Sequence, residues 1–182
     1  MHSTYSRISN AGALLTSVVL VVLGLVASTT FVVPVRVDPR LGRVAIDQPV
    51  HVVKGVSRAD PLRAERDYAF VKFDLHADLS PAFDHWNTKQ VFVSLVAESS
   101  SSSHTSQVVL WDRIVTSKRH ARIHLELARQ KYEYKSPAGT FANQTATYSV
   151  HYHIQPYVGA LTHGELARTE PIEFPRARTR SQ

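Results

Sequence analysis

Five consecutive serines followed by a histidine, Ser99–Ser103 and His104, form a stretch of this chain that could carry covalent chemistry. A serine nucleophile needs a base within hydrogen-bond reach and donors that stabilise the oxyanion. The Gly-x-Ser-x-Gly turn that presents such a serine in many hydrolases does not occur in the sequence. Because a serine run between two apolar stretches is typical of a loop, we predict a loop here and no catalytic serine.

Two pairs of histidines have the spacing of metal ligands. His151 and His153 would share one face of a strand, and His120 and His124 lie four residues apart. Neither pair belongs to a His-Glu-x-x-His motif, and no acidic third ligand is obvious near either pair. We therefore interpret both pairs as surface residues and predict neither a metal site nor a cofactor.

The remaining candidates for acid–base chemistry are separated too widely. Asp74 and Asp78 would share one strand face but lie about 13 Å apart along it. Tyr132 and Tyr134 alternate within a predicted strand, so we interpret both as packing groups. Taken alone, these residues predict that the chain is not an enzyme. The strands and the membrane helix argued below make it a membrane-tethered β-domain.

Alternation of apolar and polar residues indicates that most of these side chains are carried by β-strands. A period of two places the apolar residues on one face of a strand, and in the stretch 122–127 these include Leu127. Strands are predicted over 71–79, 90–97, 107–115, 122–127 and 145–154. Turn-forming residues separate them, and the region with Pro49, Gly55 and Pro61 is predicted to be rich in loops. The pattern predicts a mainly β chain folded as an antiparallel β-sandwich.

The chain carries no charged side chain between Arg7 and Arg36. About 20 helical residues cross a hydrocarbon layer of about 30 Å, so we predict a transmembrane helix over residues 11–33. Pro34 ends this helix because proline lacks the backbone N–H that a helix interior requires. A cleaved signal peptide is the alternative, but its apolar core would be shorter than the run that continues to Val33.

Charge and cysteine content exclude several classes of protein. The formal net charge is +6, but the basic residues are scattered, apart from Arg176, Arg178 and Arg180 near the C-terminus. Without an accompanying nucleic-acid motif this indicates a solvated basic surface, and we predict no nucleic-acid partner. The absence of cysteine excludes disulfides, a thiol nucleophile and a cysteine-based zinc site.

Two signals disagree on which side of the membrane the domain lies. Three arginines follow the apolar stretch, whereas Arg7 alone precedes it, and the positive-inside rule would therefore place the domain in the cytosol. Asn143-Gln144-Thr145 is an N-glycosylation sequon, which has meaning only on the lumenal side.

Several blocks of the sequence resemble one family. Residues 83–98 read FDHWNTKQVFVSLVAE, residues 107–115 read QVVLWDRIV, and Lys131-Tyr132 and the stretch from Asn143 to Pro156 follow in order. In these blocks, and over nearly its whole length, the chain is similar to the family of signal peptidase complex subunit 3. The serine loop, the segment from Lys118 to Arg122 and the basic tail depart from the family pattern.

The resemblance implies a single-pass protein of the endoplasmic reticulum membrane with its C-terminal domain in the lumen. It implies a non-catalytic subunit that packs against a separate catalytic serine protease subunit, beside other small membrane subunits and lipid. The resemblance also implies that Asn143 matches the N-glycosylation position of this family. The chain would then divide into a cytosolic tail at 1–10, a signal-anchor helix at 11–33, a lumenal β-sandwich at 34–175 and a basic tail at 176–182.

The family blocks also supply the candidate site residues, which are Trp86, Asn87, Lys89, Gln90, Trp111 and Asp112. One interpretation is that both tryptophans pack in the core and the polar residues cap turns. The other is that they contact the partner, since tryptophan is common in interface hot spots. Two other functions stay open, a lumenal adhesion or cargo-binding β-sandwich and a tethered hydrolase.

Overall fold

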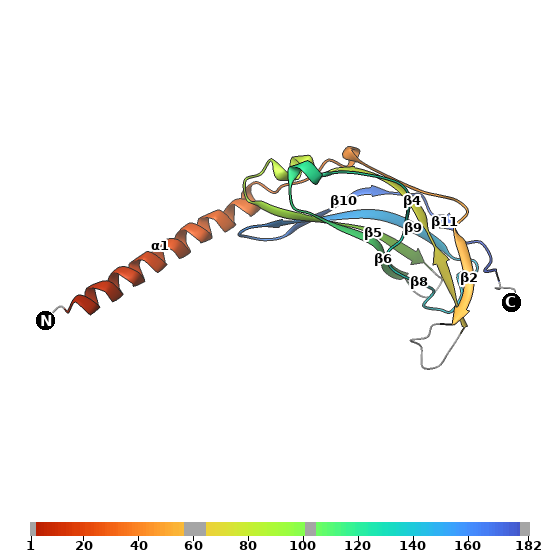
Figure 1. Ribbon diagram of the computed structural model, residues 1–182, viewed down its shortest axis with the longest axis horizontal. Coiled ribbons are helices and arrows are strands. Elements are labelled where there is room, and N and C mark those ends of the chain that lie inside the picture. The colour runs from red at the N-terminus through yellow and green to blue at the C-terminus, as the bar shows by residue number, and fades with distance from the viewer. Residues whose placement is uncertain (1–2, 57–64, 101–104, 179–182) are drawn as a thin grey trace.

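One long helix leaves one end of a layered β-structure in the computed structural model, which describes residues 3–56, 65–100 and 105–178 (Figure 1). The helix α1 (Thr4–Val32) begins at its cap Ser3, whose Oγ accepts the N–H of Ser6 at 3.2 Å. Its 29 residues span about 43 Å, and its most apolar 18-residue window has a mean hydropathy of 2.3 with no buried residue. The helix therefore has the length and composition of a membrane span, and Pro34 follows its end.

The first layer is a sheet with the strand order β10-β9-β5-β6. The two long central strands are β5 (Thr88–Ser100) and β9 (Thr145–Pro156), flanked by β6 (Thr105–Val115) and β10 (Thr162–Arg168). The short β11 (Ile172–Glu173) pairs with the start of β9. The apolar, β-branched run in β5 thus lies inside the sheet, because both of its edges are covered.

The second layer consists of two three-stranded sheets laid end to end. One has the order β1 (Gly42–Ile46), β4 (Lys72–Asp78), β7 (Arg122–Arg129), and the other β2 (His51–Val56), β3 (Glu65–Phe70), β8 (Tyr134–Lys135). Three short 3-10 helices, η1 (Pro39–Leu41), η2 (Ser80–Phe83) and η3 (Lys118–His120), connect strands. All the pairings within these sheets are antiparallel, which confirms the predicted mainly β, antiparallel fold.

The core lies between the layers and follows the predicted alternation. In β4 and its flanks Val71, Phe73, Leu75, Ala77 and Leu79 are all buried. Phe73 meets Trp111 of the first layer edge to face, with ring centroids 6.0 Å apart. Burial of such a phenylalanine is among the larger single contributions to stability of a core.

The prediction for Leu127 was wrong. Its backbone takes the left-handed conformation, with φ of +46°, and its side chain is exposed. The register of β7 shifts here, so that Glu126 and Leu127 together lie opposite Asp74. Its N–H donates to Asp74 Oδ1 at 2.7 Å, and this β-bulge turns Leu127 away from the core.

The strands β1, β2, β3, β10 and β11 were not predicted from the sequence. The region with Pro49 and Gly55, predicted to be rich in loops, contains β2, whereas β1 precedes it and Pro61 lies outside the described residues. All five are short and lie at sheet edges or beside them, where apolar alternation is weak. A strand with weak alternation forms because its backbone hydrogen-bonds to a neighbouring strand, and the sequence alone does not show which neighbour that is.

Two buried tyrosines give the fold an expected sensitivity to alkaline pH. Burial raises the pKa of Tyr134 to about 12 and also raises the pKa of Tyr148. An unfolded tyrosine ionises near pH 10, so the stabilisation by Tyr134 is complete below about pH 10 and is lost as pH rises toward about 12. We expect the unfolding free energy to fall by about 2–3 kcal/mol over this interval, measured by urea titration at each pH. The slope should be shallower in Tyr134→Phe, and an unchanged slope would contradict the assignment.

Candidate functional site

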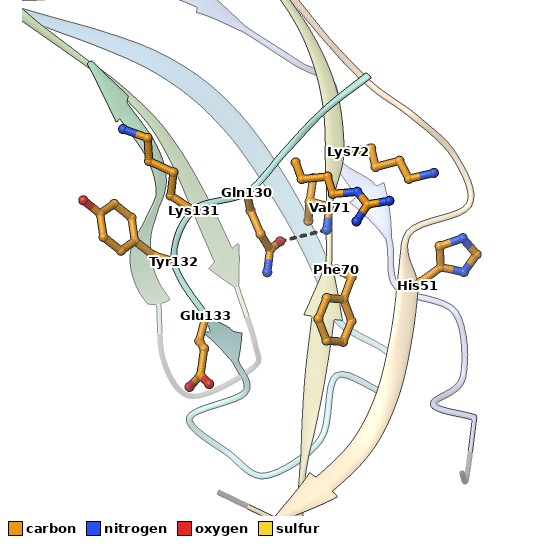
Figure 2. Close-up of a pocket in the computed structure, with 9 residues that line it drawn as sticks. His51, Phe70, Val71, Lys72, Gln130, Lys131, Tyr132 and Glu133 are labelled. Atoms are coloured by element: carbon orange, nitrogen blue, oxygen red, sulfur yellow. Dashed lines mark hydrogen bonds between the residues drawn. The ribbon is translucent and has the colours of Figure 1, made fainter. Parts of the chain in front are cut away.

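A pocket of about 420 Å³ opens at the junction of the two sheets of the second layer (Figure 2). Phe70 points outward there, because its neighbours Ala69 and Val71 are buried and successive strand residues face opposite sides. We call this cavity the Phe70 pocket. It is lined by His51, Phe70, Val71, Lys72, Arg129, Gln130, Lys131, Tyr132 and Glu133.

Gln130 forms the floor of the pocket and joins the two sheets. Its Oε1 accepts the N–H of Val71 at 2.7 Å, and its Nε2 donates to the carbonyl of Ala69 at 2.9 Å. These bonds replace the strand pairing that is interrupted between β3 and β4, so that the backbone polar groups there stay satisfied.

Gln130→Ala is expected to destabilise the domain by about 1–3 kcal/mol. The change leaves the Val71 N–H and the Ala69 carbonyl without their side-chain partner, and an unpaired buried polar group costs about this much. The measurement is urea unfolding of the full chain in detergent. Gln155→Ala is the matched control, because this exposed side chain bonds to Gln90 alone among the described residues, and it should change stability by less than about 0.5 kcal/mol. Equal effects of the two variants would contradict the role of Gln130.

A polar cluster forms the rim of the pocket toward the first layer. Asp112 Oδ1 accepts hydrogen bonds from Tyr132 Oη at 3.0 Å and from Lys131 Nζ at 3.1 Å. Lys131 Nζ also lies 5.6 Å from the ring centroid of Trp111, a cation–π distance. The backbone N–H groups of Lys131 and Tyr132 both donate to the carbonyl of Leu110 in β6, and this segment therefore ties the two layers together.

The cluster also fixes charge. Burial works to raise the pKa of Asp112, but the hydrogen bonds from Lys131 and Tyr132 outweigh it and leave this pKa below its usual value. The hydrogen bond to Asp112 raises the pKa of Tyr132. Asp112 is therefore ionised and Tyr132 neutral at physiological pH, with the charge of Lys131 neutralised by its partner.

Two further cationic side chains at the pocket lie opposite each other on neighbouring strands. Lys72 and Arg129 are directly paired across the β4–β7 ladder, where like charges destabilise a sheet. Neither forms an ion pair with any residue in the described ranges. His51 stands at the same pocket, and Glu133 is the one acidic residue among the described residues that line it. The pocket thus joins an apolar wall to the charges of Lys72 and Arg129, which no ion pair within the described residues neutralises.

The six residues predicted from the family blocks fall into two groups. Trp111 and Asp112 lie at the rim of the Phe70 pocket. The others lie at or just before the start of β5, near the end of α1. Leu95, which pairs with Trp111, lies five residues along β5 from Gln90, roughly 17 Å. The structure therefore does not bring the six residues into one site.

The second group holds the end of α1 against the β-structure. Asn87 is buried, its Nδ2 donates to the carbonyl of Val158 at 2.7 Å, and its Oδ1 accepts the N–H of Val158 at 3.2 Å. The N–H of Tyr157 donates to the carbonyl of Asn87 at 2.8 Å. The N–H of Ala160 in turn donates to Thr30 Oγ1 in the last turn of α1 at 3.4 Å. The loop between β9 and β10 consequently lies beside the helix end, as Figure 1 shows.

The chain that follows α1 is anchored as well. Val37 is buried, and its N–H donates to Tyr152 Oη at 3.1 Å. The helix and the β-structure are thus joined both by the connecting segment and by the β9–β10 loop.

The structure decides several predictions for individual side chains. Trp111 packs in the core, but Trp86 is exposed, so the interpretation that both tryptophans pack in the core was wrong. Asn87 binds the β9–β10 loop, Gln90 Nε2 donates to Gln155 Oε1 at 2.7 Å, and Lys89 is exposed.

The two tyrosines also differ. Tyr134 is buried against Phe141 and Phe174, but Tyr132 is exposed and bonded to Asp112, so the prediction that it packs was wrong. Only Tyr134 belongs to a strand, because the segment before it crosses to β6.

The two predicted histidine pairs do not assemble a cluster of potential metal ligands in the described residues. His124 contacts His76 and Glu126 and not His120, so an acidic neighbour does stand beside this histidine. His151 is bonded to Ser149 Oγ at 2.8 Å. No group of three potential metal ligands occurs in residues 3–56, 65–100 and 105–178. Ser99 is buried at the end of β5, whereas residues 101–104 of the predicted serine loop lie outside the described residues.

Sequence reasoning missed Phe70, Lys72, Arg129 and Gln130 as site residues. One signal for them exists in the pattern. Counting back from Val71 by the period of two places Phe70 on the polar face of its strand. A large aromatic residue on a polar face marks an exposed apolar spot, which is more informative than an apolar residue in the core.

Comparisons with known proteins agree with the resemblance. The profile of a family described as "Signal peptidase subunit" matches residues 1–177. Signal peptidase complex subunit 3 of Yarrowia lipolytica is 40% identical over 120 residues, which cover 64% of each chain. The protein of the same name from Saccharomyces cerevisiae is 45% identical over 97 residues, 52% of each chain. That from Schizosaccharomyces pombe is 34% identical over 140 residues, 72% of this chain and 75% of its own. The matched segment therefore spans half to two thirds of the length of the first two relatives.

Proposed function

This chain belongs to the signal peptidase subunit family, and from that premise we propose that it is a non-catalytic accessory subunit of the signal peptidase complex, which cleaves signal peptides from proteins entering the endoplasmic reticulum. The catalytic residues belong to another subunit, and this chain positions and stabilises that subunit at the lumenal face of the membrane. The observation that carries the proposal is the junction in which Thr30, Val37 and Asn87 tie α1 to the β-sandwich. A membrane helix coupled in this way would hold a bound partner at a fixed height and angle, which is a form of preorganisation.

The proposed topology is that of a signal-anchored, single-pass type II protein of the endoplasmic reticulum membrane. Residues 1–10 would be the cytosolic tail, 11–33 the anchor, 34–175 the lumenal domain and 176–182 a basic tail. Large domains translocate with little regard to flanking charge, so the arginines after α1 do not oppose a lumenal domain. The exposed side chain of Asn143 supports this topology, since the sequon stands in a turn before β9 and can accept a glycan without unfolding.

Asn143→Gln is expected to remove the glycan carried by the protein in microsomes. Wild-type protein should migrate faster on a denaturing gel after endoglycosidase H, and the variant should migrate at that faster position before treatment. Thr145→Ser, which preserves the sequon, should retain the shift. An enzyme-insensitive wild-type chain would contradict both the glycosylation and its use as evidence for a lumenal domain.

The Phe70 pocket is the proposed contact for the catalytic subunit. Its apolar wall fits a single apolar side chain, and its unneutralised Lys72 and Arg129 fit flanking carboxylates. Complementary charge of this kind favours specificity and fast association. The occupant is therefore an acidic segment of the partner with an apolar anchor residue.

The test is to solubilise microsomes in mild detergent, capture the chain by a C-terminal tag and identify stoichiometric partners by mass spectrometry. Co-elution with a membrane serine protease, other small membrane subunits and signal peptide cleavage activity is the expected result. A chain that elutes alone, or with varied secretory cargo, would overturn the proposal and favour an adhesion or cargo-binding domain.

A further inference from the structure

The end of the β-sandwich that meets α1 is built so that its loops touch the helix directly. Gly159 in the β9–β10 loop has φ of +120°, and a Cβ added there would lie 2.6 Å from Thr30 Cγ2. Only glycine combines this backbone conformation with so close an approach to the helix. His85 lines a small cleft together with Thr30 and Val33, which places the loop before β5 at the same end. The loops at Trp86 and at Tyr157–Leu161 therefore both lie beside the last turn of α1.

These loops carry the most exposed large hydrophobic side chains of the described residues after Val33. Trp86 is 66% exposed, Tyr157 68% and Leu161 63%. Each exceeds the exposure of Phe70, Ile114 and the other large hydrophobics of the sandwich. Three such side chains gathered at one end of a domain would be unfavourable in water, and exposed apolar clusters mark an interaction surface.

Their chemistry and position select the partner. Tryptophan and tyrosine combine an apolar ring with a polar group, and both concentrate at the boundary between hydrocarbon and water. At about 43 Å, α1 is longer than the hydrocarbon layer of about 30 Å, so its last turn reaches that boundary. Phe31 in this turn is itself 73% exposed, so the helix end carries an exposed apolar side chain as the loops do.

We infer that Trp86, Tyr157 and Leu161 form a lipid-contacting collar around the end of α1. The collar inserts into the interface of the leaflet on the domain side and sets the β-sandwich directly against the bilayer. The inference rests on the proposed membrane span of α1 and adds to it a second, peripheral contact with lipid made by the domain. Because Asn87 ties both loops together, the three side chains act as one surface.

The test uses the full chain in nanodiscs that contain lipids brominated either near the glycerol backbone or near the chain ends. Trp86 and Trp111 are the two tryptophans of the sequence, so Trp86→Phe isolates the signal of Trp86 by difference. Trp86 emission should be quenched strongly by the shallow bromines and weakly by the deep ones. Emission from Trp86→Phe, which comes from the core residue Trp111, should be little quenched by either lipid.

Three outcomes are distinguishable. Quenching that is equal in wild type and Trp86→Phe would overturn the collar while α1 remains in the bilayer. Quenching that is present in the isolated chain but absent in the purified complex would overturn it also, since a protein subunit would then cover the surface. A chain that alkaline carbonate extracts from the bilayer would overturn the membrane span itself, and with it the proposed function.

Discussion

Lys72→Glu should weaken capture of the catalytic subunit at least about tenfold without destabilising the domain. The substitution places a carboxylate opposite Arg129, where the wild type has two cations directly paired. An opposite-charge pair at this position stabilises a sheet by about 0.2–1 kcal/mol, so the folded domain should be as stable as the wild type or slightly more stable. An acidic partner segment would then meet a repulsive charge at the pocket, and a loss of 1.4 kcal/mol corresponds to a tenfold change in affinity.

The measurement compares the amount of catalytic subunit captured by each variant with its urea unfolding midpoint. Arg113→Glu is the matched control, because it makes the same change in net charge at an exposed position on β6, in the other layer. If both variants lose the partner equally, the effect is one of overall charge and the Phe70 pocket is not the contact. A loss of stability in Lys72→Glu would show instead that Lys72 has a structural partner.

The regular part of the fold could be predicted because each strand has two different faces. The alternation of 71–79 and 145–154 fixes which side chains face the core, and all the apolar residues in these stretches are buried. The apolar helix follows from length and the absence of charge. These features depend on local pattern, and the local pattern is complete in the sequence.

The Phe70 pocket could not be predicted, because its lining comes from elements between His51 and Glu133 that pack together only in the folded chain. The break that forms it depends on a glutamine side chain that replaces a strand hydrogen bond about 60 residues away in sequence. The outward turn of Leu127 has the same origin, since it requires the carboxylate of Asp74 on the neighbouring strand.

Trp86 and Asn87 show why hydrophobicity alone assigned the wrong residue to the core. Both residues stand in the turn before β5, in which the N–H of Thr88 donates to the carbonyl of His85 at 3.1 Å. The structure buries the asparagine, whose amide satisfies both polar groups of Val158. Hydrogen bonding to a loop that is distant in sequence therefore outweighs the hydrophobicity of the tryptophan, which is exposed.

Asn87→Ala is expected to lower the free energy of unfolding by about 2–4 kcal/mol and to reduce signal peptide cleavage by the complex. The change removes two hydrogen bonds and leaves the N–H and carbonyl of Val158 without partners, at about 1–3 kcal/mol for each unsatisfied group that stays buried. The β9–β10 loop would separate from β5, and the contact of Ala160 with Thr30 would weaken with it. Urea unfolding and cleavage of a preprotein by reconstituted complex measure the two effects.

Gln90→Ala and Asn87→Asp separate the causes of this effect. Gln90 belongs to the same family block, but within the described residues its side chain bonds to the exposed Gln155 alone, so Gln90→Ala should change stability by less than about 0.5 kcal/mol. Asn87→Asp keeps an acceptor for the Val158 N–H and loses the donor to the Val158 carbonyl, so its stability should fall between wild type and Asn87→Ala. An Asn87→Ala chain that unfolds like the wild type yet no longer captures the catalytic subunit would assign Asn87 to the partner interface. An Asn87→Ala chain that is less stable but still captures the catalytic subunit would assign Asn87 to the junction. The angle between the helix and the sandwich is set at this junction.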